Sequence, residues 1–175
     1  RFQFERFILT QLLVMALKGV PAFYLPALLA SENDIKSFSM TGQRRDLNRE
    51  KFKLDNLVSV LNNPESNANK NIKYLGNAMD IRSKLEQFHP SSEMECLSKG
   101  RSDIVVIKRG KGPKSVFAIH NMTENKINYQ LDDYDLPELI DNDFNMKDFL
   151  ASTKYNWKNI SLDPFQVIWL GSLMK

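Results

Sequence analysis

The sequence predicts a chain made of two kinds of structure, an α/β part over residues 1–90 and an all-β part over residues 91–175. Apolar residues recur at helical spacing in the first part, and short β-branched runs replace them in the second. The tetrapeptide His89-Pro90-Ser91-Ser92 separates the two patterns. We therefore expect a domain boundary at this tetrapeptide.

The composition restricts the class of protein. The chain has 24 basic and 21 acidic residues, and the resulting charge of +3 is too small to indicate a nucleic-acid partner. Cys96 is the single cysteine, which excludes an internal disulfide and favours a reducing, cytoplasmic compartment. We expect Cys96 to be a half-buried residue of a strand.

The apolar stretch from Ile8 to Ala30 raises the question of a membrane span. It is interrupted by a lysine, a glycine and two prolines, so it lacks the ~20 uninterrupted residues that a bilayer requires. The spacing instead predicts a buried helix from Phe4 to Lys18 and a strand from Gly19 to Ala30. No membrane partner is expected.

A long polar loop to Glu50 follows this strand, and a loop of that length in a compact domain is usually functional. After it, the spacing predicts a short helix from Phe52 to Leu61 that ends at Asn62-Asn63-Pro64. A second helix is expected from Asn69 to Gln87. Its predicted apolar stripe consists of Ile72, Leu75, Met79 and Leu85.

The all-β part is predicted from short runs bounded by turn residues. Gly110-Lys111-Gly112-Pro113 is expected to connect the first two strands as a hairpin, and the acidic stretch Asp132–Asp148 to form a surface loop with a short helical piece. Several short antiparallel strands in some eighty residues predict a small β-sandwich. The expected strands are Ile104–Ile107, Val116–Asn121, Lys126–Leu131 and Phe165–Leu170.

The stretch Arg45-Asp46-Leu47-Asn48-Arg49, with Asn33-Asp34 before it, is the most informative motif. Together with the run from Gly19 to Leu29, it resembles the eighth strand and following loop of sucrose phosphorylase-type enzymes of the α-amylase superfamily. Met79-Asp80-Ile81-Arg82 resembles the last barrel helix, and the segment from Leu162 to Leu170 resembles the closing strand of the C-terminal β-domain. Within that group, the residues that follow Asp46 are more similar to the glucosylglycerate phosphorylases.

This resemblance implies the fold and the reaction. Residues 1–90 would be the last strand and helices of a (β/α)8 TIM barrel, and residues 91–175 the β-sandwich domain. The parent enzyme would transfer glucose with retention between a glucoside, such as sucrose or glucosylglycerate, and inorganic phosphate, without a metal or organic cofactor. Its three catalytic carboxylates would precede Arg1, so this chain would need the remainder of the barrel and be inactive alone.

The same resemblance assigns substrate contacts within the loop. Arg45 would bind the non-reducing end of the glucosyl unit, because a guanidinium can fork across neighbouring hydroxyls. The alternative is a structural ion pair between Arg45 and either Asp46 or Asp34. Asp34 would accept a hydrogen bond from a substrate hydroxyl or form a turn, and Asn48 and Arg49 would brace the loop or touch the sugar.

A second class of function is a non-catalytic module that binds glycan through its β-domain. It would use Trp157 and Trp169 as stacking platforms, although core packing is the alternative for both rings. The two histidines, His89 and His120, have no ligand-spaced Cys, Asp or Glu nearby, so no metal site is predicted. His120 is expected on a strand of the β-domain.

Overall fold

A computed structural model describes residues 1–132, 136 and 145–172. The chain contacts group into two compact units, one formed by residues 1–21 with 77–175 and the other by residues 22–76. Each unit is described separately below. The predicted boundary between a barrel part and a β-domain at residue 90 concerns a different division and stays a prediction.

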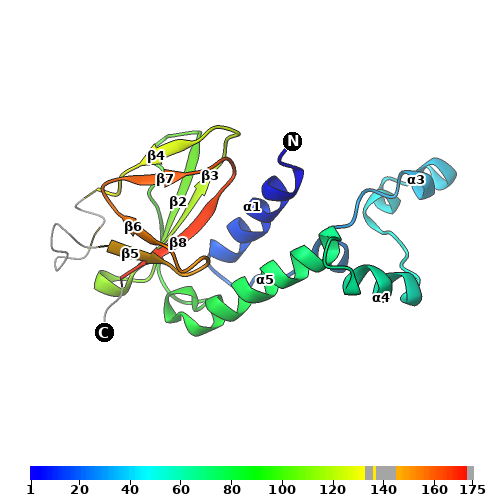
Figure 1. The fold of residues 1–175 in the computed structure, drawn as a ribbon, viewed down its shortest axis with the longest axis horizontal. Coiled ribbons are helices and arrows are strands. Elements are labelled where there is room, and N and C mark those ends of the chain that lie inside the picture. The colour runs from blue at the N-terminus through cyan, green and yellow to red at the C-terminus, as the bar shows by residue number, and fades with distance from the viewer. Residues whose placement is uncertain (133–135, 137–144, 173–175) are drawn as a thin grey trace. The chain divides into compact units, whose positions relative to one another are not determined.

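Among the described residues, eight antiparallel strands form two sheets in the first unit (Figure 1). The larger sheet has the order β1-β2-β3-β8-β5-β6, and the smaller sheet pairs β4 with β7. The predicted strands of the all-β part are confirmed as β2, β3, β4 and β8, with bounds shifted by up to two residues. Most of the acidic stretch lies outside the described residues, but its end forms β5. The strands are β1 Met94–Cys96, β2 Ile104–Arg109, β3 Val116–Asn121, β4 Ile127–Tyr129, β5 Asn145–Asp148, β6 Lys154–Asn156, β7 Ile160–Leu162 and β8 Val167–Gly171.

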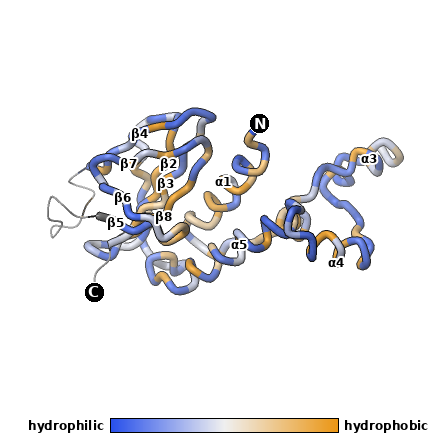
Figure 2. Tube along the Cα trace, viewed as in Figure 1, coloured by the Kyte–Doolittle hydropathy of each residue, from blue (hydrophilic) through white to orange (hydrophobic). Residues whose placement is uncertain are grey.

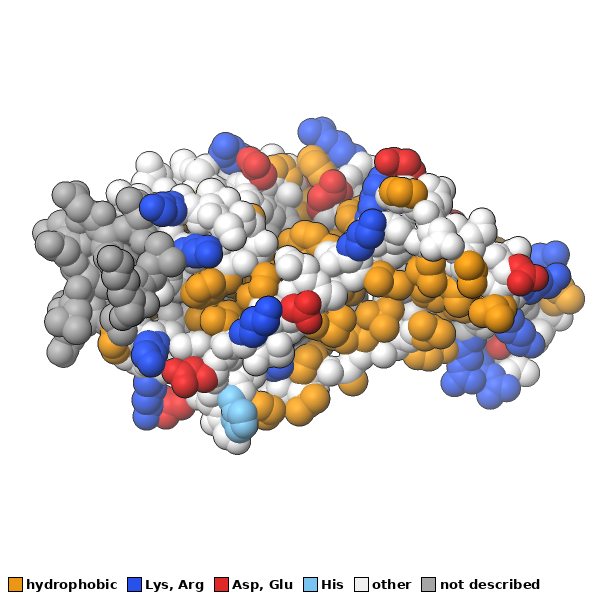
Figure 3. All heavy atoms as spheres, turned by 60° about the horizontal axis from the view of Figure 1, so that its bottom comes forward, with side chains coloured by type: hydrophobic (Ala, Val, Ile, Leu, Met, Phe, Trp, Pro, Cys, Tyr) orange, Lys and Arg blue, Asp and Glu red, His pale blue; other side chains and the backbone are white. Residues whose placement is uncertain are grey.

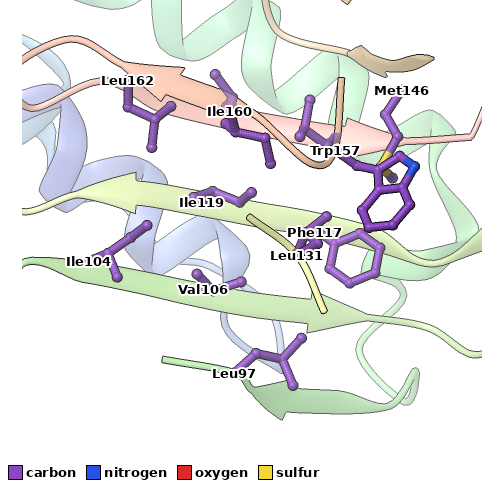
Figure 4. Packing of buried hydrophobic residues seen from close by; sticks show 12 residues of the cluster. Leu97, Ile104, Val106, Phe117, Ile119, Leu131, Met146, Trp157, Ile160 and Leu162 are labelled. Carbon is purple, nitrogen blue, oxygen red and sulfur yellow. The ribbon is translucent and has the colours of Figure 1, made fainter. Parts of the chain in front are cut away.

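The two sheets share one hydrophobic core. Alternate residues of the central strands point into it, among them Ile104 on β2, Ile119 on β3 and Ile168 on β8. Ile160 and Leu162 of the smaller sheet and Trp157 close the core from the other side (Figure 4). This arrangement is the predicted small sandwich, with sheets of unequal size.

Helix α1 (Gln3–Ala16) covers the other face of the larger sheet (Figure 1). Its buried face has the helical spacing predicted from the sequence, with Ile8, Leu12 and Met15 at most 7% exposed. All six residues of β3 are consequently buried, because the sheet has cover on both faces. The tube in Figure 2 shows this concentration of apolar residues along α1 and the central strands.

A buried arginine and a half-buried arginine hold the end of α1. Arg109 on β2 is fully buried, and its guanidinium donates to the carbonyls of Ala16 (3.0 Å), Leu17 (2.7 Å), His89 (3.0 Å) and Glu93 (3.3 Å). A cation at a helix C-terminus also interacts favourably with the helix dipole. Burial lowers the pKa of Arg109, and the charge of Arg82 lowers it further.

Arg82, near the end of α5 (Asn67–Lys84), completes this arrangement. It donates to the carbonyls of Met15 (3.0 Å) and Gly19 (2.9 Å). The ring of Phe88 lies 5.7 Å from the Arg82 guanidinium and 5.5 Å from that of Arg109. We call these three residues the arginine clamp.

The second unit is helical. It contains α2 (Leu25–Leu28), α3 (Ile35–Thr41), the 3-10 helix η1 (Arg44–Asn48), α4 (Leu54–Asn62) and the first part of α5. The helices predicted at 52–61 and 69–87 are confirmed as α4 and α5. On α5 only Leu75 of the predicted stripe is buried, because the buried face runs through Ala68, Asn71, Leu75 and Ala78 instead.

The strand predicted from Gly19 to Ala30 is wrong. Residues 19–24 have no regular structure and residues 25–28 form α2. Pro26 occupies the first turn of α2, where a missing N–H costs nothing, and among the described strands none pairs with this segment. Without a partner strand, the backbone groups of this segment have no ladder to join.

The described helices contain no segment that is both long and apolar enough to cross a membrane.

Candidate functional site: the arginine loop

Residues 33–49 form a closed loop, which we call the arginine loop. The N–H of Asp34 donates to the carbonyl of Leu47 (2.8 Å), so the two ends of the loop are joined. The Thr41 hydroxyl donates to the Asp46 carboxylate and ties α3 to η1. The prediction of an irregular loop to Glu50 is therefore corrected, because this segment carries its own short helices.

Local sequence explains how α3 begins and ends. Asp34 is its N-cap and accepts from the N–H of Ser37 (2.8 Å) and from its hydroxyl (2.6 Å). These hydrogen bonds lower the pKa of Asp34, so the carboxylate is ionised at neutral pH. Gly42 terminates the helix with φ 68°, a left-handed conformation that glycine adopts without strain.

Asp34 consequently has a structural partner for each carboxylate oxygen. Each oxygen retains a second lone pair, so the cap and a contact with a hydroxyl are compatible. The sequence contained a signal for this role in the spacing of Asp34 and Ser37, since a capping residue bonds the N–H three positions later.

Arg45 lies on η1 and its side chain is exposed. Among the described residues, its guanidinium forms no ion pair with Asp34 or Asp46, whose carboxylates bond Ser37 and Thr41 instead. The structural ion pair considered as the alternative is absent from this part of the chain. The guanidinium therefore remains available to a ligand.

Asn48 ends η1 and Arg49 is its C-cap, and both side chains are exposed. Within the described part of the chain, neither side chain has a hydrogen bond that braces the loop, although the Arg49 N–H donates to the Asp46 carbonyl (3.2 Å). Arg44 is also exposed, as expected for a solvated side chain. The structure thus brings Asp34 beside the segment that carries the three arginines.

A hollow of about 480 Å³, which was not predicted from the sequence, lies at the base of the arginine loop. Its walls include Ser31 and Glu32 before the loop, Lys51 and Phe52 after it, and α4 and the start of α5. The buried Ser31 hydroxyl has no hydrogen-bond partner. A ligand in this hollow would contact the segments on both sides of the arginine loop, because those segments form part of its walls.

The tryptophans, histidines and cysteine that were considered in the sequence analysis all lie in the first unit. Trp157 and Trp169 are 3% and 0% exposed, so neither ring is available to stack on a sugar. His120 is on β3, as predicted, and His89 is exposed. The described residues contain no cluster of His, Cys, Asp and Glu that could hold a metal ion. Cys96 lies on β1 but is exposed, which corrects the expected half-burial because β1 is an edge strand with little cover.

The chain is similar in fold to parts of two solved glycoside hydrolases. The chain superimposes on an Anoxybacillus α-amylase with a TM-score of 0.66 and 18% identity, covering 98% of this chain and 33% of that one. It superimposes on Bacillus licheniformis trehalose-6-phosphate hydrolase with a TM-score of 0.68 and 15% identity, covering 98% and 40% of the two chains. Likeness at these identities concerns the fold alone.

The curated relatives are more specific, and they are glucosylglycerate phosphorylases. The enzyme of Allomeiothermus silvanus is 30% identical over 119 residues, which are 68% of this chain and 21% of the relative. The enzyme of Escherichia coli is 21% identical over 165 residues, which are 94% of this chain and 28% of the relative. The resemblance predicted from the arginine loop is therefore confirmed.

The chain thus spans between a fifth and three tenths of the length of these two relatives. No protein-family model matches it.

Proposed function

We propose that this chain is the C-terminal part of an α-glucoside phosphorylase. The parent enzyme would transfer a glucosyl unit with retention between a glucoside, glucosylglycerate in the first place, and inorganic phosphate. The observation that carries the proposal is the alignment of 94% of the chain with 28% of a glucosylglycerate phosphorylase. Residues 1–90 would then complete a (β/α)8 barrel, and residues 91–175 would be the β-domain that follows it.

The catalytic carboxylates of this reaction would be supplied by the remainder of the barrel. A retaining enzyme of this kind uses one carboxylate as nucleophile and a second as acid and base. The glycosidic bond breaks as the glucosyl–enzyme bond forms, and the leaving oxygen takes a proton from the acid. A phosphate oxygen then attacks the glucosyl carbon while the bond to the nucleophilic carboxylate breaks. The second carboxylate regains its proton from the phosphate, and α-glucose 1-phosphate is released. The proposed reaction is cytoplasmic and needs no metal or organic cofactor.

Arg45 is proposed to bind the glucosyl unit. Its exposure and lack of an ion pair in the described chain support this role, because no structural partner competes for the guanidinium. Asp34 is proposed to accept from a substrate hydroxyl through the lone pairs that the cap leaves free. Asn48 and Arg49 are proposed to line the same site from the end of η1.

The test compares the complete reading frame that contains this chain with the 175-residue chain alone. Each purified protein is incubated with glucosylglycerate and phosphate, and the anomer of glucose 1-phosphate is identified by NMR. We expect α-glucose 1-phosphate from the complete protein and no turnover from the chain alone. Turnover by the chain alone would refute the proposal that the catalytic carboxylates lie outside this chain. A complete protein that is inactive on both glucosylglycerate and sucrose would refute the proposed phosphorylase activity.

The burial of both tryptophans opposes the alternative of a β-domain that binds glycan through them.

A further inference from the structure

A hollow of about 530 Å³ lies in the first unit beside the exposed side of α1. Its walls come from α1 and from two loops of the β-domain. Arg6, Gln3 and Thr10 supply polar groups, and Phe165 and Met122 supply apolar surface. We call it the α1 hollow. Neither the proposed glucosyl transfer nor the arginine loop uses any of these residues.

Phe165 is held in an unfavourable backbone conformation at the edge of this hollow. Asp163, Pro164, Phe165 and Gln166 form a turn that is closed by the Gln166 N–H donating to the Asp163 carbonyl (3.1 Å). Phe165 has φ 55°, the left-handed region at the third turn position, where glycine or asparagine is usual. A bulky residue in this region costs on the order of 1 kcal/mol or more.

The Phe165 ring makes only part of its possible contacts within the protein. It lies 5.7 Å from the Phe2 ring, and the Arg6 guanidinium lies 5.7 Å from its centre. Phe165 remains half-buried and Arg6 is exposed, and within the described chain Arg6 forms no ion pair. Strained residues concentrate at binding sites, since there the strained side chain does something that an unstrained one cannot.

The composition of the hollow matches one class of ligand. A pyranoside presents a face of C–H groups, which packs on an aromatic ring, and a rim of hydroxyls, which both donate and accept. Phe165 provides the ring, and the Arg6 guanidinium can donate to two neighbouring hydroxyls. The amide of Gln3 donates and accepts. Pockets of this volume that combine apolar surface with a few polar groups are typical small-molecule sites.

We propose that the α1 hollow is a binding site for a neutral pyranoside, with the ring of Phe165 as the packing surface and Arg6 as the main hydrogen-bond donor. A role for the same site in binding an anion is disfavoured, because Arg6 is the single charged residue in its walls. The site goes beyond the proposed phosphorylase activity, which is measured by turnover and does not depend on it.

The test measures binding of maltose to the purified chain by isothermal titration and by the change in NMR shifts. Phe165→Gly is the informative variant, since it removes the ring and also the backbone strain. Lys99→Gly is its matched control, because Lys99 is also at positive φ, 50°, in a turn but is absent from the walls of the hollow. Arg6→Gln tests the donor at an exposed position where a folding defect is not expected.

We expect Phe165→Gly and Arg6→Gln to weaken maltose binding about tenfold each, and Lys99→Gly to leave it unchanged. Phe165→Gly should unfold at the same or a higher temperature than the parent chain, as should Lys99→Gly. A lower unfolding temperature for Phe165→Gly alone would show that the strained ring serves packing, and would overturn the proposal. Maltose shifts outside the hollow, or tighter binding of phosphate than of maltose at Arg6, would also overturn it.

Discussion

At the scale of single residues, the molecule contains arginines in two opposite situations. Arg45 projects from a short helix into solvent, whereas Arg109 is fully buried and donates to four backbone carbonyls. The sequence singled out the first from its motif. It gave no sign of the second, because the partners of Arg109 are carbonyl groups that every residue carries.

The proposed role of Arg45 predicts a large kinetic effect in the complete enzyme. Loss of a charge-assisted hydrogen bond that strengthens in the transition state should lower kcat/KM by about 30-fold to 1000-fold in Arg45→Ala. Arg45→Lys should recover little, since a point charge cannot reproduce the fork. Arg44→Ala is the neighbouring control and should change kcat/KM by less than about threefold. Equally small decreases in kcat/KM for Arg45→Ala and Arg44→Ala would refute the proposed role of Arg45 in substrate binding.

The buried arginine predicts a large effect on stability. Arg109→Met removes the donors of four carbonyls, and those of Ala16 and Leu17 would lose their partner at the end of α1. We expect the free energy of unfolding to fall by about 3 kcal/mol or more in denaturant titrations. Arg101→Met, at an exposed arginine paired with Asp103, is the control and should change it little. An equal decrease in the free energy of unfolding in both variants would show that the carbonyl contacts of Arg109 do not stabilise the fold more than an exposed ion pair does.

His120 predicts a dependence of stability on pH. Burial lowers its pKa to about 4, so between pH 6.5 and 4 the unfolded chain binds a proton that the folded chain does not. Stability should therefore fall by about 2 kcal/mol from pH 7 to pH 5. The raised pKa of Asp148, caused by burial, acts in the opposite direction because its stability contribution is lost as pH rises. The difference between the parent chain and His120→Leu isolates the histidine, and identical pH profiles would contradict this prediction.

At the scale of elements, the sequence predicted the segments with a repeating apolar pattern and missed three of the four three-residue strands among the described residues. Helices α1, α4 and α5 and strands β2 and β3 were found because their apolar spacing continues over several turns or alternations. Strands β1, β6 and β7 have three residues each, too few for a pattern, and they are stabilised by pairing with other strands. The false strand at 19–30 arose because a run of apolar residues does not distinguish a strand from a buried connection.

For the candidate site, the motif located the arginine loop but not its internal structure. The closure between Asp34 and Leu47 joins residues far apart in sequence, which no local pattern reveals. The hollow at the base of the loop depends on four separate segments in the same way. Contacts of this kind can be read only from a folded structure.

The α3 cap offers a test of whether Asp34 has two roles. Asp34→Ser keeps a capping oxygen and removes the carboxylate, so α3 should remain intact by circular dichroism. If Asp34 also accepts from the substrate, this variant should lower kcat/KM of the complete enzyme at least tenfold. Ser37→Ala is the control that weakens the cap alone. A kinetic loss in Ser37→Ala as large as that in Asp34→Ser would assign the whole effect to the cap.

At the scale of the whole molecule, the β-domain is not independent of the helices that precede it. Helix α1 covers one face of the larger sheet, and Arg109 of that sheet is buried against the end of α1. The second unit has exposed apolar side chains, namely Leu54, Val58 and Val60 on α4 and Ile72 on α5. Figure 3 shows hydrophobic side chains on one face of the molecule. A surface of this kind is expected where a further part of a protein packs.

This packing predicts that residues 91–175 alone are less stable than the same residues in the chain. Removal of residues 1–90 exposes apolar side chains of β3 and β8 and leaves the Arg109 guanidinium without three of its four carbonyl partners, those of Ala16, Leu17 and His89. We expect strong binding of a hydrophobic dye and a lower unfolding temperature for 91–175 than for the full chain. Equal unfolding temperatures of the fragment and the full chain would show that residues 91–175 form an independently stable domain, and would contradict this prediction.

The arginine clamp also determines which substitutions the end of α1 can tolerate. Arg82 and Arg109 bind the carbonyl oxygens of residues 15, 16, 17 and 19, which stay the same whatever side chain is attached. Leu17 and Lys18 are exposed, so their side chains are constrained neither by the clamp nor by the core. The path of the chain at this point therefore depends on two arginines elsewhere in the sequence, and we expect substitutions at positions 17 and 18 to leave that path unchanged.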